Sequence, residues 1–134
     1  MSQENVEAVL RGYEAFNRGD LDAAAEGFHP EIEWSGPGVL PEKREIYRGI
    51  DGVRRFWGLW QAEFEDFTVE IEEVIEAGEQ VIVMAAVSGT GRGSGVHVRS
   101  PTFPHVWTIR DGQAVRMEML RTRAEALEAT GLSE

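Results

Sequence analysis

The Asp111-Gly112 pair constrains this chain more than any other feature of its sequence. The pair separates two β-rich runs, 103–110 and 113–120. A two-residue type I′ turn needs a positive φ at both central positions, and Asp-Gly is favoured there because the turn then follows the twist of the flanking strands. We therefore predict an antiparallel hairpin, and the rest of the chain has to supply contacts for its two faces.

The register of this hairpin decides which side chains share a face. Counted outward from the turn without a bulge, it places His105 opposite Glu118. The same face would carry further aromatic and charged groups, namely Phe103, Trp107 and Arg116. The other face would be mostly aliphatic, with Val106, Thr108, Val115, Met117 and Met119. Neither face has the composition of a solvent-exposed surface, so both are expected to pack against something.

Composition limits the classes of protein to which the chain can belong. Its 134 residues are expected to form one domain, 1–134, with a core of its own. A formal net charge of −11 disfavours nucleic acid and anionic membrane surfaces as partners. There is no cysteine, and the three histidines share no ligand spacing, so we expect no metal site and no cofactor. No signal-peptide pattern or membrane-spanning apolar run is visible, which favours a cytoplasmic protein.

Two helices are predicted at the start of the chain. The first is capped by Ser2 and ended by Gly19, and its apolar residues recur with helical spacing. These residues are Val6, Val9, Leu10, Tyr13 and Phe16. A short second helix begins at the N-cap Asp20 and continues to Phe28, where His29-Pro30 stops it.

The middle of the chain is expected to change from strand to loop to helix. Residues 31–35 alternate with period two and are predicted as a short strand. The stretch 36–48 is rich in proline and charge and is predicted as a loop, a candidate lid. The next helix opens at Gly49 and carries an aromatic stripe that either packs in the core or forms a pocket wall. The stripe consists of Val53, Phe56, Trp57, Trp60 and Phe64.

The second half of the chain is dominated by predicted strands. Runs 67–77 and 80–88 pair through a turn at Gly78-Glu79, and the second run is apolar enough for the middle of the sheet. The glycine-rich stretch 89–95 lacks the Lys-Ser/Thr of a phosphate-binding loop and is predicted as a connection. A capping box starts a last helix, 122–130. Helices first and strands last predict an α+β fold with helices on one face of the sheet.

Four stretches, taken with their order and spacing, carry a family resemblance. They are 9–20, which includes Tyr13, Phe16, Asn17 and Asp20, then 47–49, 105–112 and 123–127. This pattern resembles the SnoaL-like branch of the nuclear transport factor 2-like (NTF2-like) superfamily. The resemblance implies a cone-shaped, curved antiparallel sheet that wraps the N-terminal helices, a pocket between them, and a homodimer formed through the outer face of the sheet.

The resemblance leaves the reaction open. The superfamily includes polyketide cyclases, ketosteroid isomerases, epoxide hydrolases, dehydratases and proteins that only bind or assemble. Cyclase-like members often carry an aspartate just before the closing helix. At that position this chain has Thr122, whose hydroxyl cannot act as a base near pH 7. The Asp-Arg-Asp arrangement of the epoxide hydrolases is not recognisable in this sequence.

His105 and Glu118 are the candidate catalytic residues. On the predicted register the carboxylate orients the imidazole and favours its protonated form, which gives a general acid or base near neutral pH. Trp107 and Arg116 form the neighbouring pair and could stack on a flat ring or bind an oxyanion. The same face is also consistent with a dimer interface, where His, Trp and Arg are common.

Two functions from different classes remain at this point. One is binding of a hydrophobic small molecule in an apolar, aromatic-lined pocket, without assured catalysis. The alternative is an acid-base enzyme of the isomerase, cyclase or dehydratase type that acts on a hydrophobic carbonyl or ring compound. The expected pocket residues are Tyr13, Phe16, Trp34, Tyr47, Phe56, Trp57, Trp60, Phe103, Trp107, Arg116 and Leu120. His29 and His97 are expected at the surface.

Overall fold

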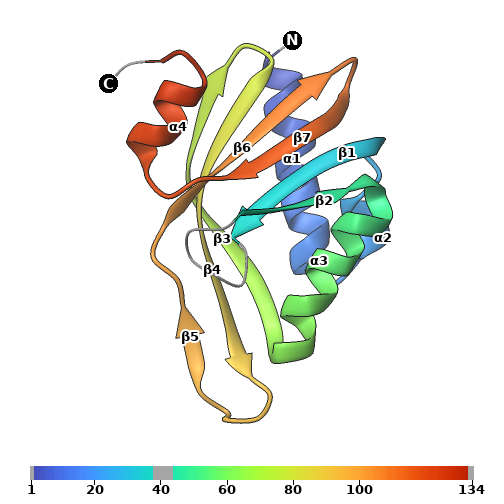
Figure 1. Cartoon of the computed structure of the whole chain (residues 1–134), viewed down its shortest axis with the longest axis vertical. Coiled ribbons are helices and arrows are strands. Elements are labelled where there is room, and N and C mark those ends of the chain that lie inside the picture. Colours follow the sequence, from blue (N-terminus) through green and yellow to red (C-terminus); the bar gives the residue numbers. More distant parts are fainter. Residues whose placement is uncertain (1, 38–43, 133–134) are drawn as a thin grey trace.

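The computed structural model describes residues 2–37 and 44–132. Its helices are α1 (Ser2–Asn17), α2 (Leu21–Ala24), α3 (Gly49–Glu63) and α4 (Arg123–Ala129). Its strands are β1 (Phe28–Pro37), β2 (Arg44–Arg48), β3 (Phe64–Ala77), β4 (Gln80–Gly91), β5 (His97–Arg99), β6 (Phe103–Arg110) and β7 (Gln113–Met119) (Figure 1).

The strands form one curved sheet in the order β2-β1-β7-β6-β4-β3, and β5 pairs with β4 (Figure 1). All neighbours are antiparallel except β1 and β7, which run parallel. The predicted α+β class with a curved sheet around the N-terminal helices is therefore confirmed. The predicted central position of the apolar run 80–88 is also correct, because β4 lies between β3 and β6.

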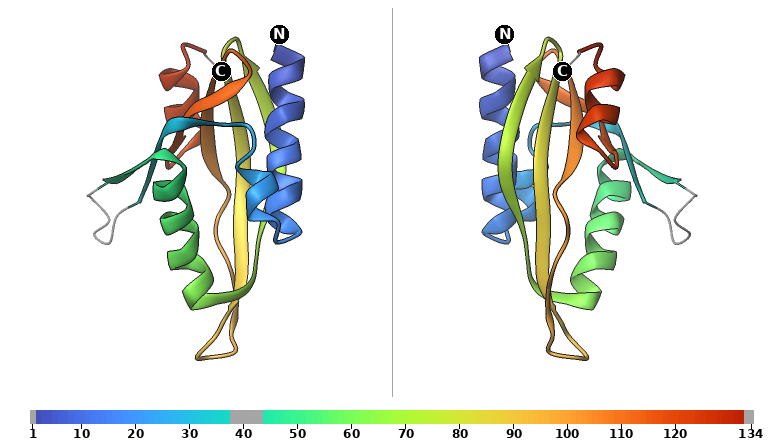
Figure 2. Two further views of the ribbon diagram at one scale, coloured as in Figure 1. Left: turned by 90° about the vertical axis from the view of Figure 1, so that its right-hand side faces the viewer. Right: turned by 90° about the vertical axis from the view of Figure 1, so that its left-hand side faces the viewer.

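The two faces of the sheet are covered by different helices. Alternate β4 residues such as Val81 and Val83 share the main core with α1 and α3. The residues between them, Ile82 and Met84, pack instead with Val106 and α4. Figure 2 shows α1 and α4 on opposite sides of the sheet. The expectation that all helices lie on one face is wrong, because β4 and β6 are apolar on both faces and each face needs a cover.

The hairpin that was predicted from Asp111-Gly112 exists, but its register changes after the second residue pair from the turn. Asp111 has φ 50° and Gly112 has φ 76°, as a type I′ turn requires. Val115 is then an extra residue, because Ile109 pairs with Ala114 while Thr108 pairs with Arg116. This β-bulge turns the rest of β7 over relative to β6.

The bulge overturns the predicted opposition of His105 and Glu118. His105 pairs with Met119, and Glu118 pairs with Val106. Met117 and Met119 consequently belong with the main core, whereas Arg116 lies on the outer face with Glu118, at an Nη2–Oε2 distance of 3.3 Å. The two predicted faces of the strand 113–120 are therefore exchanged beyond the bulge.

The N-terminal helices end and begin with local caps. Gly19 has φ 83°, its N–H donates to the Phe16 carbonyl, and the Asp20 N–H donates to Ala15, which is a Schellman ending. Asp20 caps α2 by accepting from the Ala23 N–H at 3.1 Å. The predicted extension of this helix to Phe28 is wrong, because Phe28 already pairs with Ala114 as the first residue of β1. The side chain of Ser2, the predicted first cap, lies outside what the structure describes.

Other observed element boundaries differ from the predicted ones where strand pairing overrides the local sequence pattern. Part of the predicted loop 36–48 is strand β2, which pairs with β1 from Glu33 to Pro37. Of the candidate lid 36–48, residues 38–43 lie outside the described residues. The predicted connection 89–95 is only partly correct, because residues 89–91 are the end of β4 and the turn to β5 begins after them. Thr122 and Glu125 form the predicted reciprocal capping box of α4.

Candidate functional site

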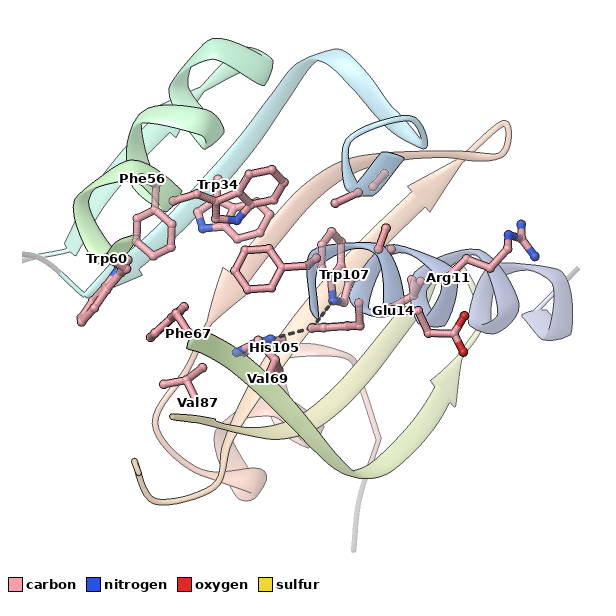
Figure 3. A pocket seen from close by; sticks show the side chains of 18 of the residues that line it. Arg11, Glu14, Trp34, Phe56, Trp60, Phe67, Val69, Val87, His105 and Trp107 are labelled. Atoms are coloured by element: carbon pink, nitrogen blue, oxygen red, sulfur yellow. Dashed lines mark hydrogen bonds between the residues drawn. The ribbon is translucent and has the colours of Figure 1, made fainter. Parts of the chain in front are cut away.

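A cavity of about 790 Å³ lies between the helices and the inner face of the sheet. Many of its lining residues are aromatic, and Figure 3 shows several of these rings converging on it from α3, the sheet and α1. The aromatic residues that line it are Tyr13, Phe16, Phe28, Trp34, Phe56, Trp57, Trp60, Phe64, Phe67, Phe103 and Trp107. The rings contact one another in succession, for example Trp34 with Trp107 at 5.5 Å and Phe16 with Trp57 at 5.4 Å between centroids.

The aromatic stripe predicted for the third helix both packs in the core and lines the cavity. Phe56 and Trp57 are buried in the main core and also line the cavity. Phe64 is the first residue of β3 and reaches the cavity together with Phe67, although residues three apart in a regular strand face opposite sides. The register of β3 shifts between them, at Asp66 with φ 53°, and this bulge directs both rings inward.

A chain of three side chains forms the polar part of the cavity wall. Trp107 Nε1–H donates to the Tyr13 hydroxyl at 2.9 Å, and that hydroxyl lies 2.6 Å from His105 Nδ1. All three residues are buried, and two of them come from adjacent positions on the inner face of β6. Figure 3 shows this pair of bonds between the sheet and α1. The Tyr13 side chain thereby links α1 to the middle of the sheet.

The hydrogen-bond inventory fixes the tautomer of His105. An indole N–H can only donate, so the Tyr13 oxygen accepts from Trp107 and its own proton is free to go to His105 Nδ1. Nδ1 is then the acceptor and Nε2 carries the ring proton. The opposite assignment would leave both the Tyr13 proton and the Nε2 lone pair without partners, whereas this one leaves only the Nε2–H unsatisfied.

Two buried donors in the wall have no partner among the described residues. They are His105 Nε2 and Trp34 Nε1. An unsatisfied buried group costs about 1–3 kcal/mol, so natural structures seldom keep one without a reason. Both residues line the cavity, and both atoms are buried in this structure, so an occupant would reach them only after neighbouring side chains move.

The interior of the cavity is uncharged at neutral pH. Burial lowers the pKa of His105 from 6.5 to about 4, because the imidazolium would lose its hydration. Burial also raises the pKa of the Tyr13 hydroxyl well above its usual value, against a smaller opposite effect of the bond from Trp107. The charged residues that line the cavity are all exposed and lie at its rim. They are Arg11, Glu14, Arg18, Glu26 and Arg99.

No metal site or membrane span is found in the part of the chain that the structure describes. No three His, Cys, Asp or Glu side chains there lie close enough together to hold a metal ion. No described helix is both long and apolar enough to cross a membrane.

Comparison with protein families settles the relationship suggested by the sequence. The model of the SnoaL-like domain matches residues 9–117, most of the chain. This chain belongs to the SnoaL-like domain family. The resemblance inferred from the four sequence stretches is thereby confirmed. No curated protein matches this SnoaL-like chain significantly.

Solved structures with the same fold include a protein crystallised with polyporic acid and a protein of unknown function. TerC, co-crystallised with polyporic acid, is 28% identical, with a TM-score of 0.77 over 96% of this chain and 98% of that chain. An NTF2-like protein of unknown function from Burkholderia pseudomallei is 27% identical, with a TM-score of 0.77 over 93% and 95%. A suggested polyketide cyclase from Sinorhizobium meliloti is 27% identical, with a TM-score of 0.67 over 85% and 94%.

Most of the residues predicted for the pocket line the cavity of this SnoaL-like domain. They are Tyr13, Phe16, Trp34, Phe56, Trp57, Trp60, Phe103, His105 and Trp107. Four others lie elsewhere. Glu118 and Arg116 are on the outer face because of the bulge, and Leu120 packs with the α4 cluster. Tyr47 is buried against Phe56, with its hydroxyl donating to Glu45 at 2.8 Å, but it does not line the cavity.

The sequence interpretation missed several cavity residues of the SnoaL-like domain. Phe28 was assigned to a helix, whereas Phe67, Val69 and Val87 were assigned to strands without a known inner face. Met119 was placed on the wrong face. Alternation of Phe67 and Val69 with charged neighbours was the available signal for β3, but no local signal indicates the bulge that moves Met119 inward.

Proposed function

We propose that this SnoaL-like protein binds a mostly apolar, ring-containing small molecule in its aromatic cavity. The observation that supports this proposal is that a cavity of about 790 Å³ stays open among aromatic side chains that could have filled it. Ligand sites for compounds of drug size commonly have volumes of about 300–1,000 Å³ and apolar walls with a few placed polar groups. A cone whose function was purely structural would gain stability if Trp57, Trp60 and Phe64 filled it.

One similar structure supports this class of ligand. TerC was co-crystallised with polyporic acid and is 28% identical to this chain. The acidic composition, with a net charge of −11, and the uncharged interior both disfavour a highly anionic ligand such as a nucleotide. A hydrophobic molecule with one or two oxygens fits the wall best.

Binding has better support than acid-base catalysis. His105 is neutral at physiological pH, its Nδ1 already accepts from Tyr13, and Nε2 carries a proton, so neither nitrogen offers a free lone pair. Glu118 is on the other face of β7 and cannot orient the ring. Thr122, at the position of the cyclase aspartate, is engaged as the N-cap of α4.

A thermal-shift screen tests the proposal. Polyporic acid, a steroid ketone and a polycyclic quinone are expected to raise the Tm, whereas nucleotides are not, because only the former bury apolar surface in the cavity. Val87→Trp should remove the shift by filling the cavity, since Val87 lines it. Val96→Trp is the matched control, because Val96 is 56% exposed and does not line the cavity. Equal shifts in both variants would refute binding at this site.

We also propose that the protein forms a homodimer through the part of the outer face that α4 leaves uncovered. A hollow there is lined by groups of both charge signs, among them Glu31, Glu79, Arg110 and Arg116. Such a mixed patch can pair with its own copy across a two-fold axis. Light scattering should give about twice the chain mass of 14.9 kDa, and Arg116→Glu should lower it. A single 14.9 kDa species at micromolar concentration would contradict the dimer.

A further inference from the structure

The unpaired buried polar groups of the described cavity wall are hydrogen-bond donors. Among the described residues, the buried side-chain nitrogens or oxygens without a partner are Trp34 Nε1 and His105 Nε2. The indole nitrogen is always a donor, and Nε2 is a donor in the tautomer that Tyr13 imposes. Both residues line the cavity. An occupant therefore gains by bringing acceptors and gains nothing by bringing further donors.

We propose that His105 Nε2–H is the polar anchor of this cavity and that it recognises an uncharged carbonyl-type oxygen on the ring-containing ligand. This inference rests on the proposed function, because it assigns the ligand's polar group in the same cavity. A ketone or quinone oxygen supplies the missing acceptor without carrying charge into an apolar interior. A carboxylate would enter without a counter-charge, because the lining arginines Arg11, Arg18 and Arg99 are exposed at the rim.

Tyr13 and Trp107 are positioning residues for this anchor. Trp107 occupies one lone pair of the Tyr13 oxygen at 2.9 Å, and the Tyr13 proton then occupies His105 Nδ1 at 2.6 Å. The ring proton is thus held on Nε2, which in Figure 3 points away from α1 toward the side where Phe67 and Val87 lie. Phe67 and Val87 both line the cavity, so this direction leads into an apolar part of it.

Two movable side chains lie beside His105 in this structure. Phe103 lies with its ring centroid 4.8 Å from that of His105, and Met119 is the cross-strand neighbour of His105. Both are only half-buried, and both line the cavity. A methionine has three rotatable bonds and repacks readily, so a ligand can reach Nε2 when these side chains change rotamer.

A pair of probes of nearly equal shape tests the anchor in the wild-type protein. Fluorene and 9-fluorenone share their ring system and differ by one carbonyl oxygen. Equilibrium dialysis should show fluorenone binding roughly tenfold more tightly, the size of effect expected from one net hydrogen bond to a donor that is otherwise unsatisfied. Equal affinities would overturn the anchor while leaving the apolar site intact. Failure of both compounds to bind would count against the proposed function itself, and with it against the anchor.

Two substitutions of His105 separate the effect of the N–H donor from the effect of the imidazole ring. His105→Gln keeps an amide N–H near the place of Nε2 and an amide oxygen that can accept a hydrogen bond, whereas His105→Leu keeps neither. The preference for fluorenone should persist in part in His105→Gln and vanish in His105→Leu, whereas fluorene binding should change little between them. A preference that survives in His105→Leu would refute the proposal.

Nitrogen-15 NMR of the imidazole provides a measurement that needs no variant to fold. The wild-type ring should give the shifts of the Nε2–H tautomer, and addition of fluorenone should move the Nε2 resonance more than addition of fluorene does. Tyr13→Phe should allow both neutral tautomers of His105 and weaken the preference for fluorenone, because the hydrogen-bond partner of Nδ1 is gone. An Nδ1–H tautomer in the wild-type protein would overturn the inference.

Discussion

Replacement of Tyr13 by phenylalanine removes one oxygen that satisfies two buried groups. Trp107 Nε1–H would lose its acceptor and His105 Nδ1 would lose its donor. Each buried group left without a partner costs about 1–3 kcal/mol, which gives a sum of about 2–6 kcal/mol. Since the hydroxyl itself no longer has to be desolvated, part of that sum is recovered, and we expect a net loss of about 2–4 kcal/mol. This is a large part of the 5–15 kcal/mol typical of a domain.

Urea unfolding followed by far-UV circular dichroism measures this loss at pH 7. Tyr47→Phe is the matched control, because the chain has two tyrosines and the Tyr47 hydroxyl donates to the side chain of Glu45 near the surface. We expect the control to lose less than about 1 kcal/mol. A loss in Tyr13→Phe no greater than that in Tyr47→Phe would refute the assignment of two dependent partners to the Tyr13 hydroxyl.

Three further expectations follow from the described packing. Below pH 6.5 the unfolded chain protonates His105, whereas the folded chain, in which the His105 pKa is about 4, does not. The free energy of unfolding should therefore fall by about 3 kcal/mol as the pH drops from 6.5 to about 4. The same pH titration of His105→Gln should lack this loss. Met117→Lys should prevent folding, seen as lost circular dichroism, because Met117 is fully buried in the main core and the bulge has moved it away from the outer face. Leu127→Ala should cost about 2–5 kcal/mol in urea unfolding yet leave ligand affinity unchanged, because α4 packs on the face opposite the cavity.

The elements with local signals were predictable from the sequence. The Asp-Gly turn, the glycine ending of α1 and the capping box of α4 each depend on neighbouring residues alone, and all three are present. Most of the cavity wall was also predictable, because aromatic residues at helical or strand spacing have few places to go other than the inside.

The features that were not predictable depend on contacts between distant residues. The extra residue Val115 in β7 has no local sequence mark, yet it decides that Met119 and not Glu118 faces the same side as His105. The charged segment that forms β2 has no strand pattern of its own, and its pairing with β1 is what makes it a strand. The bond between Tyr13 and His105 joins residues 92 positions apart, so both could be named as pocket residues without their contact being visible.

The aromatic wall also determines how this protein emits light. All four tryptophans of the chain, Trp34, Trp57, Trp60 and Trp107, line the one cavity. In most proteins indoles are scattered, and a change in emission does not say where a molecule has bound. Here all of the tryptophan emission originates from the walls of one cavity, so an occupant that absorbs near the indole emission should quench nearly all of it. Under the proposed function, tryptophan emission therefore reports ligand binding, and extracts or compound collections can be searched for a ligand without a label.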